Sequence, residues 1–449
     1  MIRLPVSELA RVLDCAVPTA DVAVENIAID SRKVHHGTLF AALPGNNVDG
    51  HDYAASAVKL GATALLVSRP LNLDVPQLIV NDVLLALGML ATMLRERIDP
   101  GVVGITGSNG KTTVKEMVAG ILRLEGDVLA TQGNYNNELG VPLSLFGLEP
   151  KHRYAVLEMG ASKAGDIQYL AGIAKPDLGL ITNIGPAHLH GFGNEEGVAR
   201  AKGEIFAALP ASGCAVINAD EPWSTLWNAM NTAGHSLTFG SRPGSDVQLV
   251  ERDGISRIHT PGGDFEFELS LPGRHNLLNA TAATAAALAL NVDLPRIQQG
   301  LESVEPVAGR LNLVKTNAGW TIIDDTYNAN PASLYSALQV LSGMQGTPWL
   351  VLGDMKELGK GSLKMHREVG EAAKAMGVRQ LFTTGEMSSY TADAFGAGAE
   401  HFENREELAK ELCSRLRPGI ICLVKGSRSM GMETIVEAII ETAKMREAS

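Results

Sequence analysis

The chain has 449 residues, of which 45% are hydrophobic and 20% charged, a composition typical of a globular protein of about two to four domains. Its formal net charge of −12 argues against binding to the phosphate backbone of nucleic acid, which needs an excess of Lys and Arg. The sequence has no run of about 18 or more apolar residues, the length needed to cross a membrane, and the N-terminal segment lacks the apolar core of a signal peptide. We therefore expect a cytoplasmic protein without nucleic-acid or membrane partners. We also expect a monomer.

The first 82 residues predict a small α/β domain. Apolar strands are expected at Ala64–Ser68 and Leu78–Val80, with a helix near Tyr53–Leu60 between turn signals. A helical stretch at Val83–Arg97 follows, and Asp99-Pro100-Gly101 breaks the chain after it. We therefore place the first domain at residues 1–82.

Residues 104–113 read Gly-Ile-Thr-Gly-Ser-Asn-Gly-Lys-Thr-Thr, between an apolar strand and a helical pattern that we expect to end at Gly126. This arrangement is typical of a phosphate-binding loop, whose N–H groups and helix dipole attract anionic oxygens. Lys111 is expected to reach the β- and γ-phosphates of ATP, and Thr112 to bind Mg²⁺. Ile105 stands where the general pattern has glycine, so the loop is a variant form, and a Gly-rich turn without a ligand is the weaker alternative. The residues expected to hold the triphosphate are Gly107, Ser108, Asn109, Gly110, Lys111, Thr112 and Thr113.

The middle segment, residues 83–308, alternates strands and helices, which predicts a parallel sheet covered on both faces. Its strands are expected at 155–157, 178–184 and 215–217. Residues 240–272 are rich in strand and turn signals and predict a local antiparallel insertion. The Ala-rich stretch at 281–290 fits a buried helix.

The pattern restarts near Ala308, so residues 309–449 predict a third domain. Its strands are expected at 321–323, 349–352, 380–383 and 420–424, each followed by helical spacing. The alternation indicates a second doubly wound sheet of Rossmann type, although a G-x-G-x-x-G fingerprint is missing. The predicted fold class is therefore α/β, with three domains.

Several polar residues follow the carboxyl ends of predicted strands, where parallel sheets bind ligands. Glu158 and His188 are expected to face the same crevice as Lys111, as metal ligands or as groups that orient one. His190 competes with His188, and the spacing alone does not choose between them. A salt-bridged strand end and a hydrogen-bonded loop histidine are the plain structural alternatives.

Other candidates have ordinary structural explanations. By sequence pattern alone, Lys202 reads as a solvated helix lysine, and Asn137 belongs to a Gly- and Asn-rich turn. Asn330 as N-cap before Pro331 explains those two residues. It does not explain Asp325 and Tyr327 at the end of a strand, which indicate a loop that faces a ligand.

Taken together, these motifs resemble the ATP-dependent Mur ligases over the whole chain. The matching segments are 30–32, 37–45 and 49–51 near the N-terminus, 106–113, 133–140, 158–160 and 202–204 in the middle, and 325–331, 352–359 and 425–430 near the C-terminus. The C-terminal motifs are typical of the branch that adds D-alanyl-D-alanine. The Asp-Asn-Pro-Arg motif of the branch that adds diaminopimelate or lysine is missing.

The resemblance implies a small α/β domain that binds a UDP-sugar, a central ATPase-type parallel sheet and a C-terminal Rossmann-like domain. It implies a ligase that forms an acyl phosphate with ATP and joins D-alanyl-D-alanine to UDP-N-acetylmuramoyl-tripeptide, giving a peptidoglycan precursor. The rivals are another amide ligase, such as the diaminopimelate-adding enzyme or folylpolyglutamate synthase, and a P-loop ATPase that acts as a switch or motor.

The resemblance also implies residue roles. Thr112 and Glu158 would hold one Mg²⁺, and His188 rather than His190 matches the family's metal ligand. Lys202 matches the lysine that carries a carbamate beside a second Mg²⁺. Further nucleotide contacts would come from Asn276, Asn279, Arg310 and Asp325. Substrate contacts would come from Ser31, Arg32, Asn137, Tyr327 and Asn328.

Overall fold

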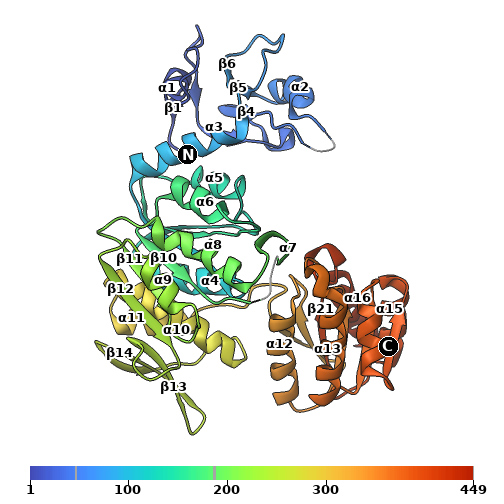
Figure 1. Ribbon diagram of the computed structural model, residues 1–449. Coiled ribbons are helices and arrows are strands. Elements are labelled where there is room, and N and C mark those ends of the chain that lie inside the picture. Colours follow the sequence, from blue (N-terminus) through green and yellow to red (C-terminus); the bar gives the residue numbers. More distant parts are fainter. Residues whose placement is uncertain (46–47, 186–188, 448–449) are drawn as a thin grey trace.

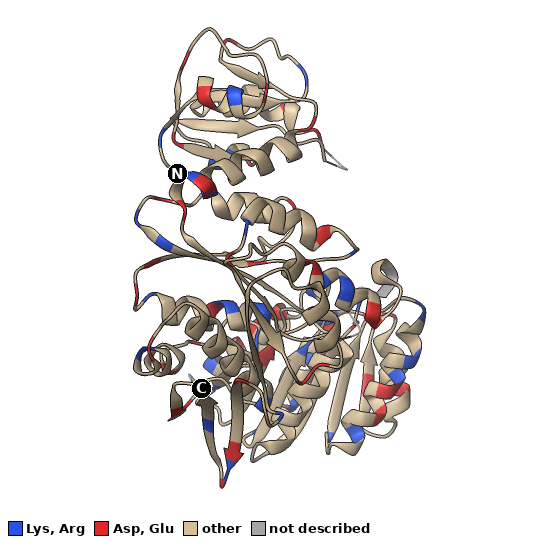
Figure 2. Ribbon diagram, turned by 60° about the vertical axis from the view of Figure 1, so that its left-hand side comes forward, with Lys and Arg blue, Asp and Glu red and all other residues tan. Residues whose placement is uncertain are grey.

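A computed structural model describes residues 1–45, 48–185 and 189–447 of the chain. Three successive stretches each build one main sheet. Figure 1 shows the N-terminal unit in blue above the central unit, and the C-terminal unit, in orange and red, beside the central unit. Helices cover each sheet, which confirms the predicted α/β class with parallel-sheet domains. Asp and Glu are interspersed with Lys and Arg over all three units (Figure 2).

The N-terminal unit is a four-stranded parallel sheet in the order β3-β4-β5-β6. The expected strands at 64–68 and 78–80 and the helix near 53–60 are confirmed, shifted by one or two residues at most of their ends. A two-stranded antiparallel pair, β1 and β2, lies beside α1. The elements are β1 (Leu4–Pro5), α1 (Val6–Val12), β2 (Ala23–Val24), β3 (Asn26–Ala28), β4 (Thr38–Ala41), α2 (Ala54–Lys59), β5 (Ala62–Val67) and β6 (Gln77–Ile79).

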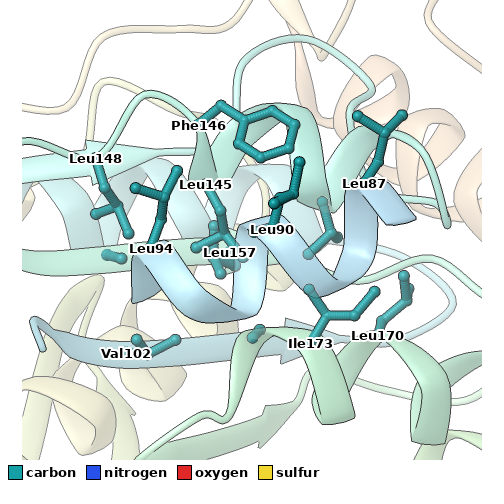
Figure 3. Packing of buried hydrophobic residues seen from close by; sticks show 14 of the residues in the cluster. Leu87, Leu90, Leu94, Val102, Leu145, Phe146, Leu148, Leu157, Leu170 and Ile173 are labelled. Atoms are coloured by element: carbon teal, nitrogen blue, oxygen red, sulfur yellow. The ribbon is translucent and has the colours of Figure 1, made fainter. Parts of the chain in front are cut away.

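Helix α3 (Val83–Ile98) joins the N-terminal unit to the central one. Asp82 caps its start by accepting a hydrogen bond from the Leu85 N–H at 3.0 Å. Its buried face, which includes Leu90, packs against apolar side chains of the central unit, such as Phe146 and Ile173 (Figure 3). Burial of such side chains stabilises by about 1.5–3 kcal/mol each, so the two units share one core along this helix.

The central sheet has nine strands in the order β15-β14-β13-β12-β11-β10-β7-β9-β8, parallel from β8 to β13. Strands β13–β15 are antiparallel as expected, but they extend the main sheet instead of forming a local insertion, because β13 pairs with β12. The strands are β7 (Gly101–Thr106), β8 (Asp127–Ala130), β9 (His152–Glu158), β10 (Leu178–Ile181), β11 (Cys214–Asn218), β12 (His235–Gly240), β13 (Val247–Arg252), β14 (Ile255–Thr260) and β15 (Gly263–Glu266).

Helices cover both faces of this sheet. One face holds α4, α10 and α11, and the other holds α3, α6 and α8. The predicted Ala-rich helix is α10, and it is buried. Helix α4 ends at Leu122, so the expected end at Gly126 is wrong; Gly126 instead donates its N–H back to the Leu122 carbonyl. The helices are α4 (Lys111–Leu122), α5 (Gly140–Leu145), α6 (Asp166–Ala174), α7 (Leu189–Phe192), α8 (Glu195–Ala207), α9 (Ser224–Met230), α10 (Arg274–Ala289) and α11 (Leu294–Glu302).

The C-terminal unit is a six-stranded sheet in the order β16-β17-β21-β18-β19-β20, parallel except for the edge strand β16. All four expected strands are present. Two apolar clusters lie on its two faces. The elements are β16 (Asn312–Lys315), β17 (Thr321–Asp325), α12 (Pro331–Gly343), β18 (Thr347–Gly353), η3 (Gly359–Gly361), α13 (Ser362–Ala375), β19 (Gln380–Thr384), α14 (Ser388–Phe395), β20 (Ala399–Phe402), α15 (Arg405–Arg415), β21 (Ile420–Lys425) and α16 (Glu433–Glu447). No helix among the described residues is long and apolar enough to span a bilayer.

Candidate active site

A cavity of about 1140 Å³ lies where the carboxyl ends of the central strands meet the C-terminal unit. Residues from the start of α3 line it as well. Most of the expected site residues line this cavity: Gly107, Ser108, Asn109, Gly110, Lys111, Thr113, Asn137, Glu158, Lys202, Asn276, Asn279, Arg310, Asp325, Tyr327 and Asn328. The cavity is therefore the place where the chain can combine a nucleotide with other substrates.

The loop between β7 and α4 has the backbone of a phosphate-binding turn. Gly110 has a left-handed φ of 79° and precedes the first residue of α4. A Cβ atom at Gly110 would lie 2.6 Å from Oδ1 of Asn279, so the glycine is required for both conformation and space. The Lys111 ammonium donates to the carbonyls of Gly107 and Ser108 at 2.8 and 3.3 Å, which holds its charge at the centre of the loop.

Glu158, at the end of β9, is the carboxylate that faces this loop. It is 2% exposed, and its Oε2 accepts a hydrogen bond from the Thr112 hydroxyl at 2.6 Å. Its Oε1 accepts from Nδ2 of Asn136 at 2.8 Å. Burial acts to raise the pKa of Glu158, but the Lys111 charge and the hydrogen bonds outweigh it and hold the pKa below its ordinary value. An ionised carboxylate beside a hydroxyl is a pair of hard oxygen donors that fits Mg²⁺.

Lys202 is buried within α8, so the interpretation as a solvated helix lysine is wrong. Its side chain lies in the cavity wall, the residue is 3% exposed, and it makes no hydrogen bond or ion pair with any residue that the structure describes. Burial holds the pKa of the Lys202 ammonium well below its ordinary value, and the neighbouring Lys111 charge lowers it further. This environment favours the neutral amine over the ammonium more than water does.

His188, the expected metal ligand, lies outside the described residues. The segment just before it is held against the phosphate loop. The Asn109 N–H donates to Oδ1 of Asn183 at 3.0 Å, and the Ser108 hydroxyl donates to the Gly185 carbonyl at 3.2 Å. The chain that leads to His188 therefore starts directly beside the loop that contains Lys111.

The C-terminal unit reaches the phosphate loop through Arg310. Its guanidinium donates to the Thr112 hydroxyl at 2.7 Å, across 198 positions of sequence. The same guanidinium lies 4.0 Å from the centre of the Tyr327 ring, a cation–π contact that restricts its position. Arg310 thus links the strand-end loop of β17 to the start of α4.

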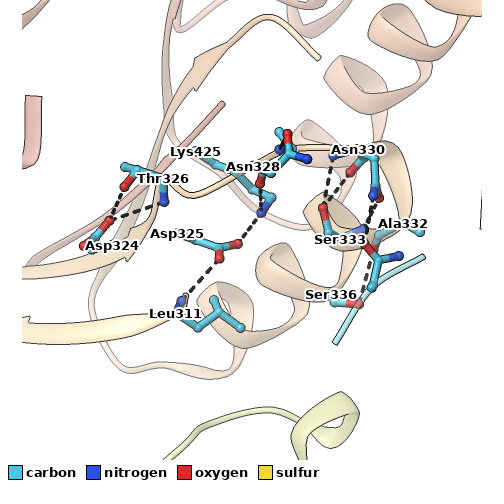
Figure 4. A network of polar contacts seen from close by, with 12 residues as sticks. Leu311, Asp324, Asp325, Thr326, Asn328, Asn330, Ala332, Ser333, Ser336 and Lys425 are labelled. Atoms are coloured by element: carbon cyan, nitrogen blue, oxygen red, sulfur yellow. Dashed lines mark hydrogen bonds and ion pairs between the residues drawn. The ribbon is translucent and has the colours of Figure 1, made fainter. Parts of the chain in front are cut away.

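Asp325, expected to contact the nucleotide, lines the cavity and is held by contacts within its own unit (Figure 4). Its Oδ2 accepts from the buried Lys425 ammonium at 2.5 Å, and its Oδ1 accepts from the Leu311 N–H at 3.2 Å. Burial raises the pKa of Asp325, and the Lys425 charge opposes that shift. Lys425 also donates to the Asn328 carbonyl at 2.9 Å, so it holds the loop after β17 in place.

Of the remaining expected contacts, one pair of residues lies beside the phosphate loop and the other pair lies away from the cavity. Asn276 and Asn279 are buried on α10 beside the phosphate loop, and Nδ2 of Asn279 donates to Oδ1 of Asn276 at 3.1 Å. Ser31 and Arg32 belong to the N-terminal unit and do not line the cavity. Arg32 is exposed and forms an ion pair with Asp30 at 2.8 Å. Any contact that they make with a substrate would therefore be remote from the phosphate loop.

The matches to known protein families agree with this geometry. Residues 23–96 match the model "Mur ligase family, catalytic domain", residues 105–287 match "Mur ligase middle domain", and residues 309–428 match "Mur ligase, glutamate ligase domain". The UDP-N-acetylmuramoyl-tripeptide–D-alanyl-D-alanine ligase of Escherichia coli K12 is 41% identical over 98% of this chain and 99% of its own length. The chain belongs to the Mur ligase family.

Solved Mur ligase structures share the arrangement of all three units. A crystal structure of MurF from Acinetobacter baumannii superimposes with a TM-score of 0.92 at 34% identity, covering 98% of this chain and 99% of that one. The MurF ligase of Thermotoga maritima, solved in complex with ADP, gives a TM-score of 0.83 at 30% identity, covering 94% of this chain and 98% of that one. The fold of this Mur ligase is thus shared with enzymes of the branch that adds D-alanyl-D-alanine.

Sequence reasoning missed some residues that hold the site of this Mur ligase together. Asn136 was part of the expected Asn-rich turn, but its contact with Glu158 had no signal of its own. Lys425 lay in a matching motif without an assigned role. Asn330 was assigned only as an N-cap, yet its Nδ2 also donates to Oδ1 of Asn109 at 2.8 Å.

Substitutions of Asn330 can separate its role as the cap of α12 from its hydrogen bond to Asn109. Its Oδ1 accepts from the Ser333 N–H at 2.9 Å in a capping box. We expect Asn330→Ala to lower the free energy of unfolding by about 0.5–2 kcal/mol, because α12 loses its cap. Asn330→Asp should keep most of that stability, because a carboxylate caps equally well, while it loses the donor to Asn109. Urea unfolding of both variants tests this expectation. An equal decrease in the free energy of unfolding in the two variants would contradict it.

Proposed function

We propose that this Mur ligase joins D-alanyl-D-alanine to UDP-N-acetylmuramoyl-tripeptide with hydrolysis of ATP to ADP and phosphate. The observation that carries the proposal is the cavity that holds a phosphate-binding loop, an ionised Glu158 and a buried Lys202, with residues of the C-terminal unit in its wall. The domain division would be 1–82 for the UDP-sugar, 83–308 for ATP and 309–449 for the dipeptide and nucleotide. The enzyme would act in the cytoplasm as a monomer.

The reaction requires activation of a carboxylate. A carboxylate oxygen of the tripeptide would attack the γ-phosphorus of ATP, giving an acyl phosphate and ADP. The free amine of D-alanyl-D-alanine would then attack the acyl carbon and lose a proton, and phosphate would leave as the amide forms. Both steps gather negative charge, which Lys111 and the N–H groups at the start of α4 would stabilise.

The enzyme would also use two Mg²⁺ ions. Thr112 and Glu158 would hold one, and His188 with a carbamate on Lys202 would hold the second. Bound Mg²⁺ would neutralise phosphate charge during phosphoryl transfer. Arg310, already in contact with Thr112, would carry a further positive charge to the nucleotide from the C-terminal unit.

The environment of Lys202 supports a carbamate on its side chain. The neutral amine nitrogen would form a bond to the carbon of CO₂ and release one proton, which gives an anionic oxygen donor. A positively charged ammonium at the same place would repel Mg²⁺ and Lys111 alike. Burial without a partner among the described residues supports this assignment, because an isolated buried ammonium is costly.

The substrates would approach the cavity from different sides. The family resemblance implies that Asn276 and Asn279 would contact the adenine, and both residues line the cavity on α10. Asn137, Tyr327 and Asn328 would contact the peptide or the dipeptide near the reacting carboxylate. The remote pair Ser31 and Arg32 would bind the UDP end of the long muramyl substrate.

The test of this function is a product assay. We expect ADP and phosphate to form only when both UDP-N-acetylmuramoyl-tripeptide and D-alanyl-D-alanine are present with Mg–ATP, because the acyl phosphate is useful only when an amine follows it. Mass spectrometry should detect the UDP-muramyl pentapeptide. Rapid ATP hydrolysis with neither substrate, and no amide product with both, would favour the alternative of a P-loop ATPase.

A further inference from the structure

Lys115 is a buried charge that the proposed reaction does not use. It lies on α4, one helical turn after Thr112, and is only 2% exposed. Its ammonium donates to the Thr131 carbonyl at 2.7 Å and pairs with Oε1 of Glu116 at 2.6 Å. Burial of an ammonium costs free energy that an apolar side chain of similar length would avoid. A role beyond filling space is therefore indicated.

Thr131 connects this lysine to Glu158. It follows edge strand β8 directly and is 1% exposed. Its hydroxyl accepts the Glu158 N–H at 3.0 Å, and its own N–H donates to the Val156 carbonyl at 3.0 Å. Thr131 also begins the turn that carries Asn136, whose amide donates to Oε1 of Glu158. By anchoring Thr131, Lys115 thus fixes the backbone of Glu158 and also the loop that places Asn136 against the Glu158 carboxylate.

We infer that Lys115 is a positioning residue. By anchoring Thr131, it holds Glu158 in the position in which its carboxylate binds a divalent cation. Helix α4 then holds Glu158 twice, directly through the Thr112 hydroxyl at 2.6 Å and indirectly through Lys115. The indirect connection acts on the backbone and makes no hydrogen bond to the carboxylate, so it fixes Glu158 without occupying an oxygen needed by a cation. The inference rests on the proposed binding of a cation by Glu158.

Binding of Mn²⁺ tests this inference, measured by electron paramagnetic resonance of the full chain with the non-hydrolysable ATP analogue AMP-PNP. We expect Lys115→Met to raise the dissociation constant of Mn²⁺ by about 10-fold or more, because loss of a residue that orients a ligand costs roughly 10–100-fold in metal affinity. The affinity for AMP-PNP in EDTA should stay close to that of the parent. Arg123→Met, at an exposed position just after the same helix, is the matched control and should bind Mn²⁺ normally.

A second pair of variants tests the connection through Thr131. Thr131→Val removes the hydroxyl and should weaken Mn²⁺ binding similarly, whereas Thr131→Ser restores the acceptor and should recover it. If Lys115→Met does not fold, this pair decides. A folded Lys115→Met protein with the Mn²⁺ affinity of the parent, or equal affinity in the two Thr131 variants, would overturn the inference. A parent that binds Mn²⁺ with AMP-PNP yet makes no amide would instead overturn the proposed function.

Discussion

Lys111→Ala should lower kcat of amide formation by about 10³-fold or more, the largest effect expected of any single substitution in the phosphate loop. The ammonium lies at the centre of the loop, where it donates to the Gly107 and Ser108 carbonyls. During phosphoryl transfer the same charge would stabilise negative charge that develops on the phosphate oxygens. Removal of one preorganised donor of this kind costs roughly 10²–10³-fold, and loss of a full positive charge adds to that.

The fold should survive this substitution. The two hydrogen bonds that are lost contribute about 0.5–1.5 kcal/mol each, and both carbonyls belong to residues that line the cavity, where water can replace the ammonium. Steady-state release of phosphate in the presence of both substrates measures the effect, and thermal unfolding by circular dichroism checks the fold. Lys410→Ala, at an exposed position on α15, is the matched control. A Lys111→Ala protein with turnover within about tenfold of the parent would contradict the assigned role.

The parts of the fold that could be predicted from sequence share a physical cause. Buried parallel strands such as β7 and β21 are continuous apolar runs, and helices such as α3 combine a long apolar stripe with clear end signals. Edge strands β8 and β16 were missed because they are short and half-exposed, so their polar residues hide the pattern. The pairing of β13 with β12 was missed because turn signals in a sequence do not reveal which strands pair with each other.

The site was predictable where chemistry follows a local motif. Lys111, Thr112 and the glycines of the loop could be assigned because the strand, turn and helix that position them are contiguous in sequence. The contact of Arg310 with Thr112 could not, because the two residues come from different folding units and meet only after these pack. Burial of Lys202 was equally hidden, since a helix lysine is buried or exposed according to the elements that cover its helix.

Lys202→Ala should remove most of the activity, by about 10–100-fold or more, because a cation would lose an anionic oxygen ligand or the group that orients one. Two observations motivate this expectation. Lys202 is 3% exposed in the cavity wall, and burial holds the pKa of its ammonium well below the ordinary value. A neutral amine reacts with CO₂, whereas an ammonium does not, so the environment that makes the free lysine costly also favours its carbamate.

The carbamate gives Lys202→Ala a distinctive behaviour. A small carboxylate such as acetate should fit the vacated space and partly restore turnover, because it supplies the anionic oxygen that the carbamate would have carried. Arg200→Ala, on the same helix but exposed, is the matched control and should need no added carboxylate. In the parent protein supplied with ¹³C-labelled bicarbonate, ¹³C nuclear magnetic resonance should detect a carbamate carbon that Lys202→Ala lacks. Full activity of Lys202→Ala, together with no such signal in the active parent, would rule out the carbamate. Catalysis would then proceed without any group on this side chain.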